Sequence, residues 1–332
     1  MKQRKIDHIK LSLDEGSQSY LNPFDKYQLN YRALPEINLD AVTTGTKLFG
    51  KSISQPLIIA SMTGGTQYAA TINKNLAIAA EKTRVAMGVG SQRIALSSRS
   101  AIESFKLVRK NAPNAIIFAN MGAIQLNNAK TFQDYRTIID MIGANALYLH
   151  INPLQEALQP GGDTNYAGLI DKITSLISKL RVPVFVKEVG NGIDEESAKA
   201  LIKAGVSGID VAGVGGTSYS WIEAKRANSK NMADWFKSVG VATDQAIVGI
   251  SKFKSSIDIV ASGGIRTPLD TLKAAALGAD YYSFARPLLQ KAIISSDETI
   301  EYIEEFQKGL QIALFSCGIK NWSDAKHGDL LI

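Results

Sequence analysis

From residue 56 onward, short β-branched apolar runs alternate with longer segments in which apolar residues recur every three or four positions. Each short run has the length of a strand that is buried on both faces, as the strands of a parallel sheet are. The runs lie at residues 56–62, 86–90, 115–121, 146–151, 182–187, 208–213, 258–264 and 281–285. Helical periodicity is found between them, for example at residues 72–83, 131–142, 169–180, 195–204 and 268–277.

This alternation predicts the fold class. Eight strands, each followed by a helix, indicate an α/β protein with a (β/α)8 TIM barrel. Gly205 and Gly278 directly follow two of the helical segments, as glycine C-caps do. A doubly wound open sheet is the alternative, but it would normally carry a glycine fingerprint after its first strand. The "MTGGT" at residues 62–66 lacks that spacing.

Two segments depart from the regular repeat, and the whole chain, residues 1–332, is expected to form a single domain. Residues 1–55 precede the first strand and predict an irregular N-terminal lead-in that closes one end of the barrel. Residues 214–242 make an overlong connection after the sixth strand. A connection of this length is more often a lid or a disordered segment than scaffold, so it predicts a mobile loop.

Polar or glycine residues follow all eight predicted strands. Because barrel enzymes carry their chemistry at the carboxyl ends of the strands, these residues predict a functional site. A purely structural barrel would have little reason for such a pattern. The residues are Ser61, Met62, Thr63, Ser91, Gln92, Arg93, Asn120, His150, Asn152, Gln155, Glu156, Lys187, Gly213 to Thr217, Gly263, Gly264, Ala285 and Arg286.

The loops after the last two strands, "SGGIRTPLD" and "FARPLL", predict an anion cradle. Glycines leave backbone N–H groups accessible, and each following helix directs its positive end toward the same place. Gly-Gly also occurs in ordinary tight turns. The position of these two loops in the barrel favours phosphate, which this fold often binds there.

Three other strand-end residues have two readings each. Lys187 ends an apolar strand, so it either extends to solvent or faces an anionic or electron-rich ligand. Glu156 could hold Mg²⁺ together with waters and substrate phosphates, or it could simply stabilise the start of a helix. His150 is more often a structural residue than a catalyst. No Ser/His/Asp or Cys/His set and no His/Cys zinc grouping can be assembled from the sequence.

Composition and charge narrow the function classes. The chain of 332 residues has 45% hydrophobic and 20% charged residues, a net charge of +6 and a pI near 9.1. Basic residues alternate with acidic ones instead of forming a tract with aromatics, which argues against nucleic acid as a partner. The excess positive charge suits either a small anionic ligand or a merely basic solvated surface.

No membrane partner is expected, because no apolar stretch approaches the roughly 18 residues of a membrane span. The N-terminal "MKQRKIDHIK" has no signal-peptide pattern, and the only cysteine is Cys317. These features predict a cytoplasmic protein. Arg4, Lys5 and His8 lie close together in the N-terminal segment, and the default interpretation of that segment alone is a frayed basic tail.

Taken together, the motifs resemble the type 2 isopentenyl-diphosphate isomerase family, the FMN-dependent isomerases of isoprenoid synthesis. The resemblance covers nearly the whole chain. It rests, in family order, on "RKIDHI", "ASMTGG", "VGSQR", "ANMGA", "LHINPLQE", "VKEVGNG", "GGTSY", "ASGGIRTPLD" and "ARPLL". "MTGG" or "SGGIR" alone would indicate only an FMN- or phosphate-binding barrel. The N-terminal "RK", the "NxxQE" stretch and "KEVGNG" make the assignment specific.

The resemblance implies a role for each strand-end group. Glu156 would bind Mg²⁺, and Gln155 and Lys187 would act in catalysis with reduced FMN. The lead-in that binds substrate would belong to the same subunit or to a neighbouring one. FMN would be bound by Ser61, Met62, Thr63, Ser91, Asn120, Lys187, Thr217, Gly263, Gly264, Arg266, Ala285 and Arg286, and the diphosphate substrate by Arg4, Lys5, His8, Arg93, His150, Asn152 and Gln155.

One position departs from the family pattern. Ala212 stands where the family often has serine, so a hydroxyl contact to the flavin phosphate is missing. Backbone N–H groups of Gly215 and Gly216 are the available replacement. The departure concerns FMN affinity more than the type of reaction.

The resemblance also implies the chemistry. A double bond moves when one carbon gains a proton and another carbon, two positions away, loses one. Ordinary acids protonate an unactivated alkene poorly, so reduced FMN would exchange the proton and the barrel would supply orientation and charge. NADPH would reduce the flavin without net redox change per turnover, and the protein would be a homo-oligomer, a tetramer or an octamer.

Two other functions are compatible with an FMN-binding barrel. An FMN-dependent 2-hydroxy-acid oxidoreductase needs a base and usually carries a His-Gly-Gly-Arg-type stretch, whereas "GVGGTSY" after the sixth strand has no histidine. A flavoprotein that uses FMN only for structure or sensing would show no turnover with any diphosphate.

Overall fold

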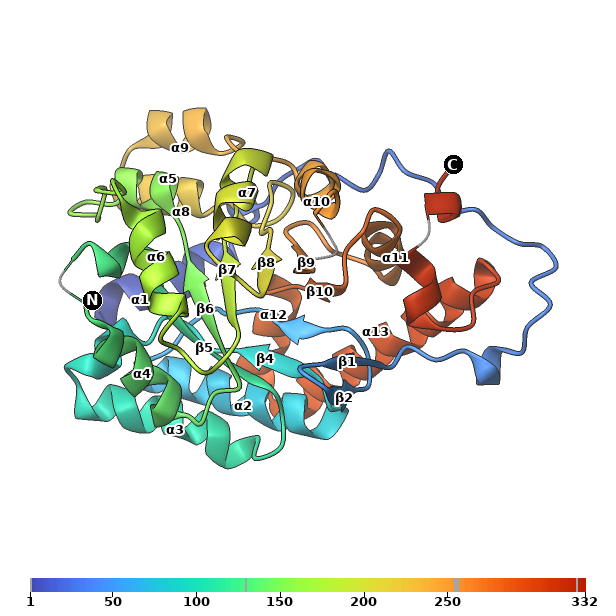
Figure 1. Ribbon diagram of the computed structural model, residues 1–332, viewed down its shortest axis with the longest axis horizontal. Coiled ribbons are helices and arrows are strands. Elements are labelled where there is room, and N and C mark those ends of the chain that lie inside the picture. Colours follow the sequence, from blue (N-terminus) through green and yellow to red (C-terminus); the bar gives the residue numbers. More distant parts are fainter. Residues whose placement is uncertain (1, 129, 254–256, 327) are drawn as a thin grey trace.

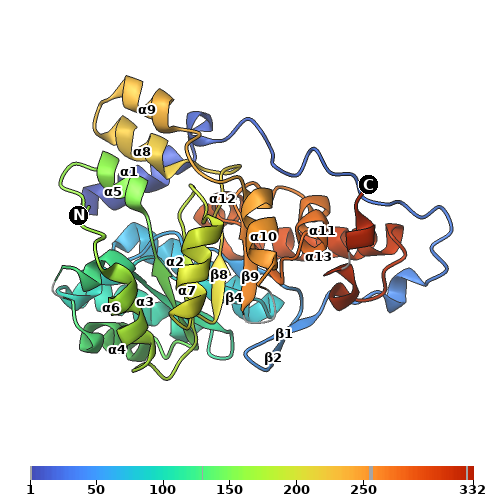
Figure 2. The same cartoon turned by 45° about the horizontal axis from the view of Figure 1, so that its top comes forward.

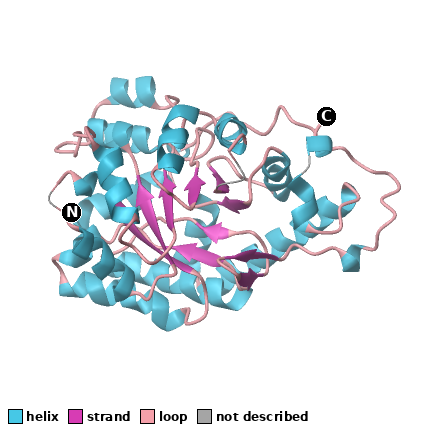
Figure 3. Cartoon of the chain, viewed as in Figure 1, coloured by secondary structure: helices cyan, strands magenta, loops and turns pink. Residues whose placement is uncertain are grey.

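Eight parallel strands form the centre of the computed structural model, which describes residues 2–128, 130–253, 257–326 and 328–332 (Figures 1 and 3). Each strand falls within or beside one of the eight predicted apolar runs. Their bounds are β3 (Ile58–Ile59), β4 (Ala86–Gly88), β5 (Ile117–Gly122), β6 (Ala146–His150), β7 (Val184–Lys187), β8 (Gly208–Asp210), β9 (Asp258–Ser262) and β10 (Tyr281–Ser283).

The sheet closes into a barrel. From β3 to β10 each strand pairs in parallel with the next strand along the chain. A parallel bridge between Leu57 and Tyr282 joins the first strand to the last, and the Tyr282 N–H donates to the Pro56 carbonyl at 2.9 Å. The sequential order and the closure confirm the predicted (β/α)8 barrel and exclude the doubly wound alternative.

Helices surround the barrel and follow its strands (Figure 3). Thr66 caps the N-terminus of α2, and Thr267 forms a capping box with Asp270 at the start of α11. Gly205 and Gly278 follow α7 and α11 with φ of 92° and 123°, as expected for glycine C-caps. The barrel helices are α2 (Gln67–Thr83), α3 (Arg99–Asn111), α4 (Phe132–Met141), α5 (Pro153–Leu158), α6 (Leu169–Ile177), α7 (Glu195–Lys203), α10 (Thr243–Ser251), α11 (Pro268–Ala276), α12 (Arg286–Ile294) and α13 (Ser296–Ser316).

Part of the lead-in closes the end of the barrel at which the strands begin. The hairpin of β1 (Thr46–Leu48) and β2 (Lys51–Ile53) places Phe49 at its turn. The Phe49 ring lies 5.6 Å from Phe118 and 5.7 Å from Phe185, between ring centroids, and Phe118 stacks on Tyr148 at 4.5 Å. This aromatic group fills the base of the barrel.

The first residues of the lead-in lie at that opposite end and are not a frayed tail. They form α1 (Lys2–Ser12), which packs beside α8 and buries Ile9 (Figure 2). The chain then runs along the outside of the barrel to the hairpin. The expected irregular lead-in is thus found after this helix, and the helix itself was not expected; tertiary contacts stabilise it although its own sequence is mostly polar.

The connection at residues 214–242 also contains helices. It forms α8 (Tyr219–Arg226) and α9 (Lys230–Phe236), and Ser218 caps the first of them. Helix α8 packs against α1, α5 and α9. The segment is thus not a simple loop, while its mobility stays a prediction. Among the helices of the described residues, none combines the length and the apolar character that a membrane crossing requires.

Candidate functional site

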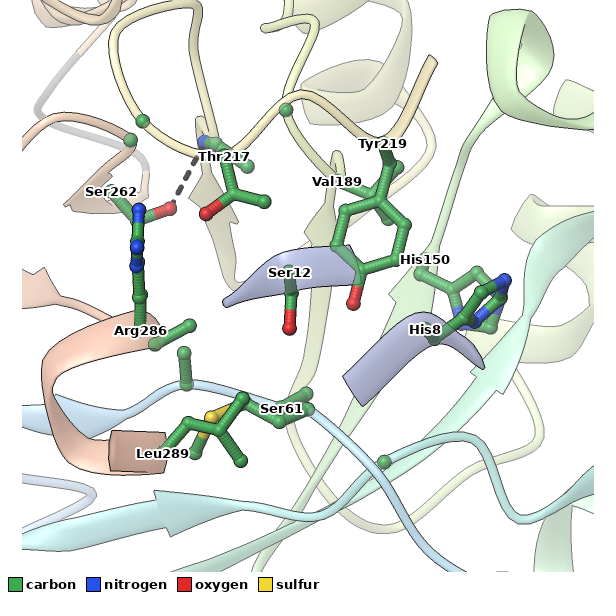
Figure 4. A pocket seen from close by; sticks show the side chains of 18 of the residues that line it. His8, Ser12, Ser61, His150, Val189, Thr217, Tyr219, Ser262, Arg286 and Leu289 are labelled. Carbon is green, nitrogen blue, oxygen red and sulfur yellow. Dashed lines mark hydrogen bonds between the residues drawn. The ribbon is translucent and has the colours of Figure 1, made fainter. Parts of the chain in front are cut away.

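A cavity of about 730 Å³ opens at the carboxyl ends of the strands, with α1 and α8 beside it (Figure 4). Its size is typical of sites for cofactors and small ligands. Of the strand-end residues predicted from the sequence, Gln92, Val214 and Gly215 do not line it, whereas every residue that the family resemblance assigns to the site does. These are Arg4, Lys5, His8, Ser61, Met62, Thr63, Ser91, Arg93, Asn120, His150, Asn152, Gln155, Glu156, Lys187, Thr217, Gly263, Gly264, Arg266, Ala285 and Arg286.

The two glycine-containing loops meet at one side of this cavity. Gly263 and Gly264 have φ of 95° and 85°, a region that side chains disfavour. A Cβ on Gly263 would lie 2.1 Å from the Gly213 carbonyl oxygen, so only glycine fits between the loops after β8 and β9. Ala285, the residue before α12, lines the same side. The free N–H groups of the first helical turn and the exposed glycine backbone suit an anion such as phosphate.

Arg286 stands at the start of α12 and reaches the lead-in. Its guanidinium donates to the Leu13 carbonyl at 2.8 Å and pairs with the Glu15 carboxylate at 2.6 Å. The Glu15 side chain is 89% exposed, and an ion pair with so exposed a carboxylate contributes little. Arg286 can therefore exchange this partner for a bound anion at small cost.

Several buried hydroxyls facing the cavity lack partners. Within the described residues, Ser61 Oγ, Thr63 Oγ1 and Ser283 Oγ are buried without a hydrogen bond. An orphaned buried hydroxyl costs about 1–3 kcal/mol. A ligand with several hydrogen-bonding groups, such as a flavin ring and its ribityl chain, would satisfy them.

Lys187 points into the mouth of the barrel instead of extending to solvent. It is 7% exposed, and its Nζ lies 3.0 Å from Asp210 Oδ2 and 3.3 Å from Ser262 Oγ. Ser262 Oγ also donates to the other oxygen of Asp210. The alternative of a solvent-directed lysine is therefore wrong: Lys187 is a buried cation held beside the cavity.

The residues after β6 form a polar shelf on α5. Asn152 Nδ2 donates to Gln155 Oε1 and to Glu156 Oε1, both at 3.1 Å. The other Glu156 oxygen accepts from Gln159 at 3.2 Å and from the Asp163 N–H at 2.8 Å. No group of three or more His, Cys, Asp or Glu side chains that could hold a metal was found among the described residues. Any metal here would rely on Glu156 together with its ligand's own oxygens.

Three cations form one wall of the cavity. Arg4 donates to Gln159 Oε1 at 2.8 Å, and Lys5 donates to the Gly64 carbonyl. Neither makes an ion pair with a carboxylate in the part of the chain that the structure describes, whereas Arg93 pairs with Asp163 at 3.0 Å.

The electrostatics of this wall favour an anion. Burial, together with the nearby charges of Arg4 and Arg93, lowers the pKa of Lys5 to about 8. Burial and Arg93 likewise lower the pKa of Arg4. Since the cations destabilise one another, a ligand with several negative oxygens would be bound with charge-assisted hydrogen bonds.

His150 is neutral at physiological pH. Its Nδ1 lies 2.7 Å from Asn120 Oδ1, an acceptor, so Nδ1 carries the proton and Nε2 can accept a hydrogen bond. Burial, with Arg93 and Lys187 nearby, lowers the pKa of His150 to about 4.

Sequence reasoning missed Glu223 on α8. This side chain is fully buried, and its Oε1 lies 2.7 Å from His8 Nε2 and 3.1 Å from Gln155 Nε2. Burial alone would raise the pKa of Glu223, but His8, Gln155 and Arg226 bring it below the ordinary value. The sequence offered one signal for Glu223. It lies four residues after Tyr219, so the two residues share one face of a helix.

Several isopentenyl-diphosphate delta-isomerases are similar to the chain over nearly its full length. An isopentenyl-diphosphate delta-isomerase of Hydrogenovibrio crunogenus is 44% identical over 99% of this chain and 97% of its own. The isomerase of that name from Nostoc sp. is 43% identical over 99% and 95% of the two chains. The chain belongs to the type 2, FMN-dependent isopentenyl-diphosphate delta-isomerase family.

Two further comparisons concern the FMN-binding family model and the fold. The model of the FMN-dependent dehydrogenase family matches residues 152–331. A solved structure of mandelate oxidase with benzoyl-formic acid superposes with a TM-score of 0.67 over 99% of this chain and 93% of its own, at 18% identity. At that identity the likeness shows the shared barrel fold alone.

The tautomer and charge of His150 can be tested by NMR. Because His150 binds a proton only near pH 4 when folded but near 6.5 when unfolded, its ring resonances should stay constant from about pH 5.5 to 8. The free energy of unfolding should fall as the pH drops from about 6.5 toward 4. Loss of a signal in His150→Gln assigns the resonance. A titration midpoint near pH 6.5 would show that His150 is solvated.

Proposed function

We propose that this protein interconverts isopentenyl diphosphate and dimethylallyl diphosphate, with FMN and Mg²⁺ as cofactors and NADPH as the reductant of the flavin. One observation carries the proposal: the same cavity has a cradle of glycine backbone on one side and a wall of mutually destabilised cations on another. One side suits the phosphate of a bound cofactor, and the other suits a substrate diphosphate. The names of the relatives support the same reaction.

FMN fits the residues present. Its phosphate would lie at the backbone of Gly263 and Gly264 and at the start of α12, beside Arg286. The unpartnered hydroxyls of Ser61 and Thr63 would bind polar groups of the cofactor. Lys187 would place its positive charge next to the flavin ring. When bound and reduced, FMN would supply the group that gives and takes the proton at the substrate's double bond.

The cationic wall would bind the substrate's diphosphate. Arg4 and Lys5 would exchange their present acceptors, Gln159 and the Gly64 carbonyl, for phosphate oxygens. Arg93 would join them. Glu156 would hold Mg²⁺ against the same diphosphate, since Mg²⁺ commonly takes one carboxylate plus waters and phosphate oxygens.

Gln155 would orient the hydrocarbon end of the substrate. Its amide is held from both sides, because Asn152 donates to its oxygen and its nitrogen donates to Glu223. Helices α1 and α8 lie over this part of the cavity and would exclude water. Exclusion of water matters because the reaction develops charge on carbon that water would quench.

The hydroxy-acid oxidoreductase alternative is disfavoured by three observations. His150 has a pKa near 4, which makes it a poor base at neutral pH. Among the described residues, no other histidine follows a barrel strand. The three positive charges of the cationic wall are also more than a substrate with a single carboxylate requires.

The direct test of the proposed function is an anaerobic assay. The protein is incubated with FMN, Mg²⁺, NADPH and isopentenyl diphosphate, and dimethylallyl diphosphate is quantified. Formation of this product at a rate proportional to enzyme supports the proposal. Pyruvate formation from lactate would favour the oxidoreductase, and FMN binding without turnover of any diphosphate would favour a sensing or structural flavoprotein.

The glycine cradle predicts a selective loss of FMN in Gly264→Ala. A Cβ there would lie 3.0 Å from the Gly215 carbonyl oxygen and would obstruct the backbone approach. FMN affinity, measured by flavin fluorescence, should fall at least about tenfold. Gly50→Ala is the matched control, since Gly50 has φ of 76° with nothing near its Cβ position. Equal affinities in the two variants would argue against a phosphate at this cradle.

Glu156→Gln should remove most turnover and leave FMN affinity near that of the unmutated protein. The amide has the same shape but binds Mg²⁺ poorly. Chelator should reproduce the loss in the unmutated enzyme. Glu298→Gln, a surface carboxylate paired with Lys291, is the control. Full activity and metal dependence in Glu156→Gln would show that Glu156 only stabilises α5 and its following loop.

The lowered pKa of Lys5 predicts that substrate binding weakens at high pH. Its pKa near 8 means that the charge that binds diphosphate is present below this pH and is lost above it. The value of kcat/KM should fall as the pH rises through about 8, and Lys5→Arg should move this fall to higher pH because arginine stays charged. Lys10→Arg, an exposed position on the same helix, should not. The same fall in Lys5→Arg would assign it to another group.

A further inference from the structure

The loop that follows Lys187, with the sequence "EVGNG", surrounds a buried carboxylate. Glu188 is 2% exposed. One of its oxygens, Oε2, accepts hydrogen bonds from the backbone N–H groups of Val189 at 2.6 Å, Gly190 at 2.7 Å, Asn191 at 2.5 Å and Gly192 at 3.2 Å. Four consecutive N–H groups converging on one oxygen fix the path of the loop.

Glu188 has no role in the function proposed above, and keeping it buried is costly. Burial raises the pKa of Glu188 to about 7, and the backbone donors limit that rise. Its second oxygen, Oε1, is buried without a hydrogen bond within the described residues. A buried carboxylate with one unsatisfied oxygen is expensive for stability alone, so the conformation that it imposes on the loop needs another explanation.

The outer side of this loop holds both ends of the long connection at residues 214–242. At the far end, the Val241 N–H donates to the Asn191 carbonyl at 2.8 Å, and Asn191 Nδ2 donates to the Val239 carbonyl at 2.5 Å. At the near end the backbone approaches so closely that a Cβ on Gly190 would lie 2.8 Å from the Thr217 carbonyl oxygen.

Between these two ends, the connection carries side chains of the cavity. Thr217 and Tyr219 line it, and Glu223 binds both His8 and Gln155. Helix α8 packs mainly on other helices, α1, α5 and α9, so its position depends on these contacts and on the two ends of the connection. A shift of either end would move Glu223 relative to Gln155.

We propose that Glu188 is a positioning residue for the reaction. By fixing the loop at residues 188–192, it places the 214–242 connection, and thereby Glu223, against Gln155 over the cavity. This inference rests on the proposed function for its kinetic consequence. Its structural consequence can be measured without any turnover.

Hydrogen exchange on the FMN-loaded protein tests the structural consequence. In Glu188→Gln, which keeps a neutral acceptor, and in Glu188→Ala, which keeps none, amides of residues 189–192 and 214–242 should exchange faster, by about tenfold or more in the alanine variant. Amides of the barrel strands should be unchanged.

Glu81→Ala is the matched control. Glu81 also accepts two backbone N–H groups with one oxygen, from Asn114 and Ala115 at 3.0 Å each, but it lies beside the loop before β5, at the opposite end of the barrel. Loss of the Glu81 carboxylate should leave the rates of amide hydrogen exchange in residues 214–242 unchanged. If Glu188→Ala does not fold, Glu188→Gln alone must show faster exchange in that connection.

A substitution at another residue should displace the 214–242 connection while leaving the Glu188 carboxylate in place. A Cβ on Gly192 would lie 2.3 Å from the Val241 carbonyl oxygen, so Gly192→Ala should push the far end of the connection away. It should raise exchange in residues 214–242, as the Glu188 variants do.

The kinetic consequence separates positioning from general destabilisation. Glu188→Gln should lower kcat by about tenfold or more, whereas the KM for isopentenyl diphosphate should change less than about threefold, since Arg4 and Lys5 keep their contacts with Gln159 and the Gly64 carbonyl, which lie outside the displaced segments. Unchanged exchange in residues 214–242 in both Glu188 variants would overturn the inference, as would an unchanged kcat. Absence of isomerase activity in the unmutated protein would contradict the proposed function and leave the exchange result standing.

Discussion

The register of the closed parallel sheet determines where every other functional group lies. His150 pairs with Lys187 across β6 and β7, and Lys187 pairs with Asp210 across β7 and β8. These pairings place an imidazole, an ammonium and a carboxylate side by side at the last positions of three adjacent strands. A shift of one residue would turn each side chain to the other face of the sheet, so the register is as important for the chemistry as for the core.

Two helices that are remote from each other in the sequence bring charged side chains of opposite sign to the cavity. Helix α1 brings Arg4 and Lys5 to one wall of the cavity, whereas α8 brings Glu223, which meets His8 of α1. The His8–Glu223 contact spans 215 residues of sequence, and it docks the lead-in onto the barrel. Within the described residues, Arg4 and Lys5 have no carboxylate partner in an ion pair, which leaves their charge available to a ligand.

The barrel and most of the rim could be predicted from the sequence. Buried strands of a parallel sheet are recognisable as apolar β-branched runs. The residue after each run lies at the end of the barrel where the strands end, regardless of where each helix begins or how long it is. The glycine cradle was predictable for the same reason, because Gly263, Gly264 and the start of α12 follow the last two strands.

The covering elements could not be predicted, because their structure depends on long-range contacts. Helix α1 has few apolar positions and is stabilised by docking, so its sequence reads as a basic tail. Helices α8 and α9, of eight and seven residues, are too short to be stable alone, and their segment reads as a mobile loop. Glu223 was missed because its partners, His8 and Gln155, come from two other parts of the chain.

The central claim is that one cavity binds a cofactor phosphate at the glycine cradle and a substrate diphosphate at the cationic wall. A crystal structure of the protein with FMN and isopentenyl diphosphate tests it most directly. The account predicts the FMN phosphate against Gly264 and Arg286, and the diphosphate oxygens within hydrogen-bonding distance of Arg4 and Lys5. A diphosphate bound elsewhere, with Arg4 still on Gln159 and Lys5 still on the Gly64 carbonyl, would contradict it.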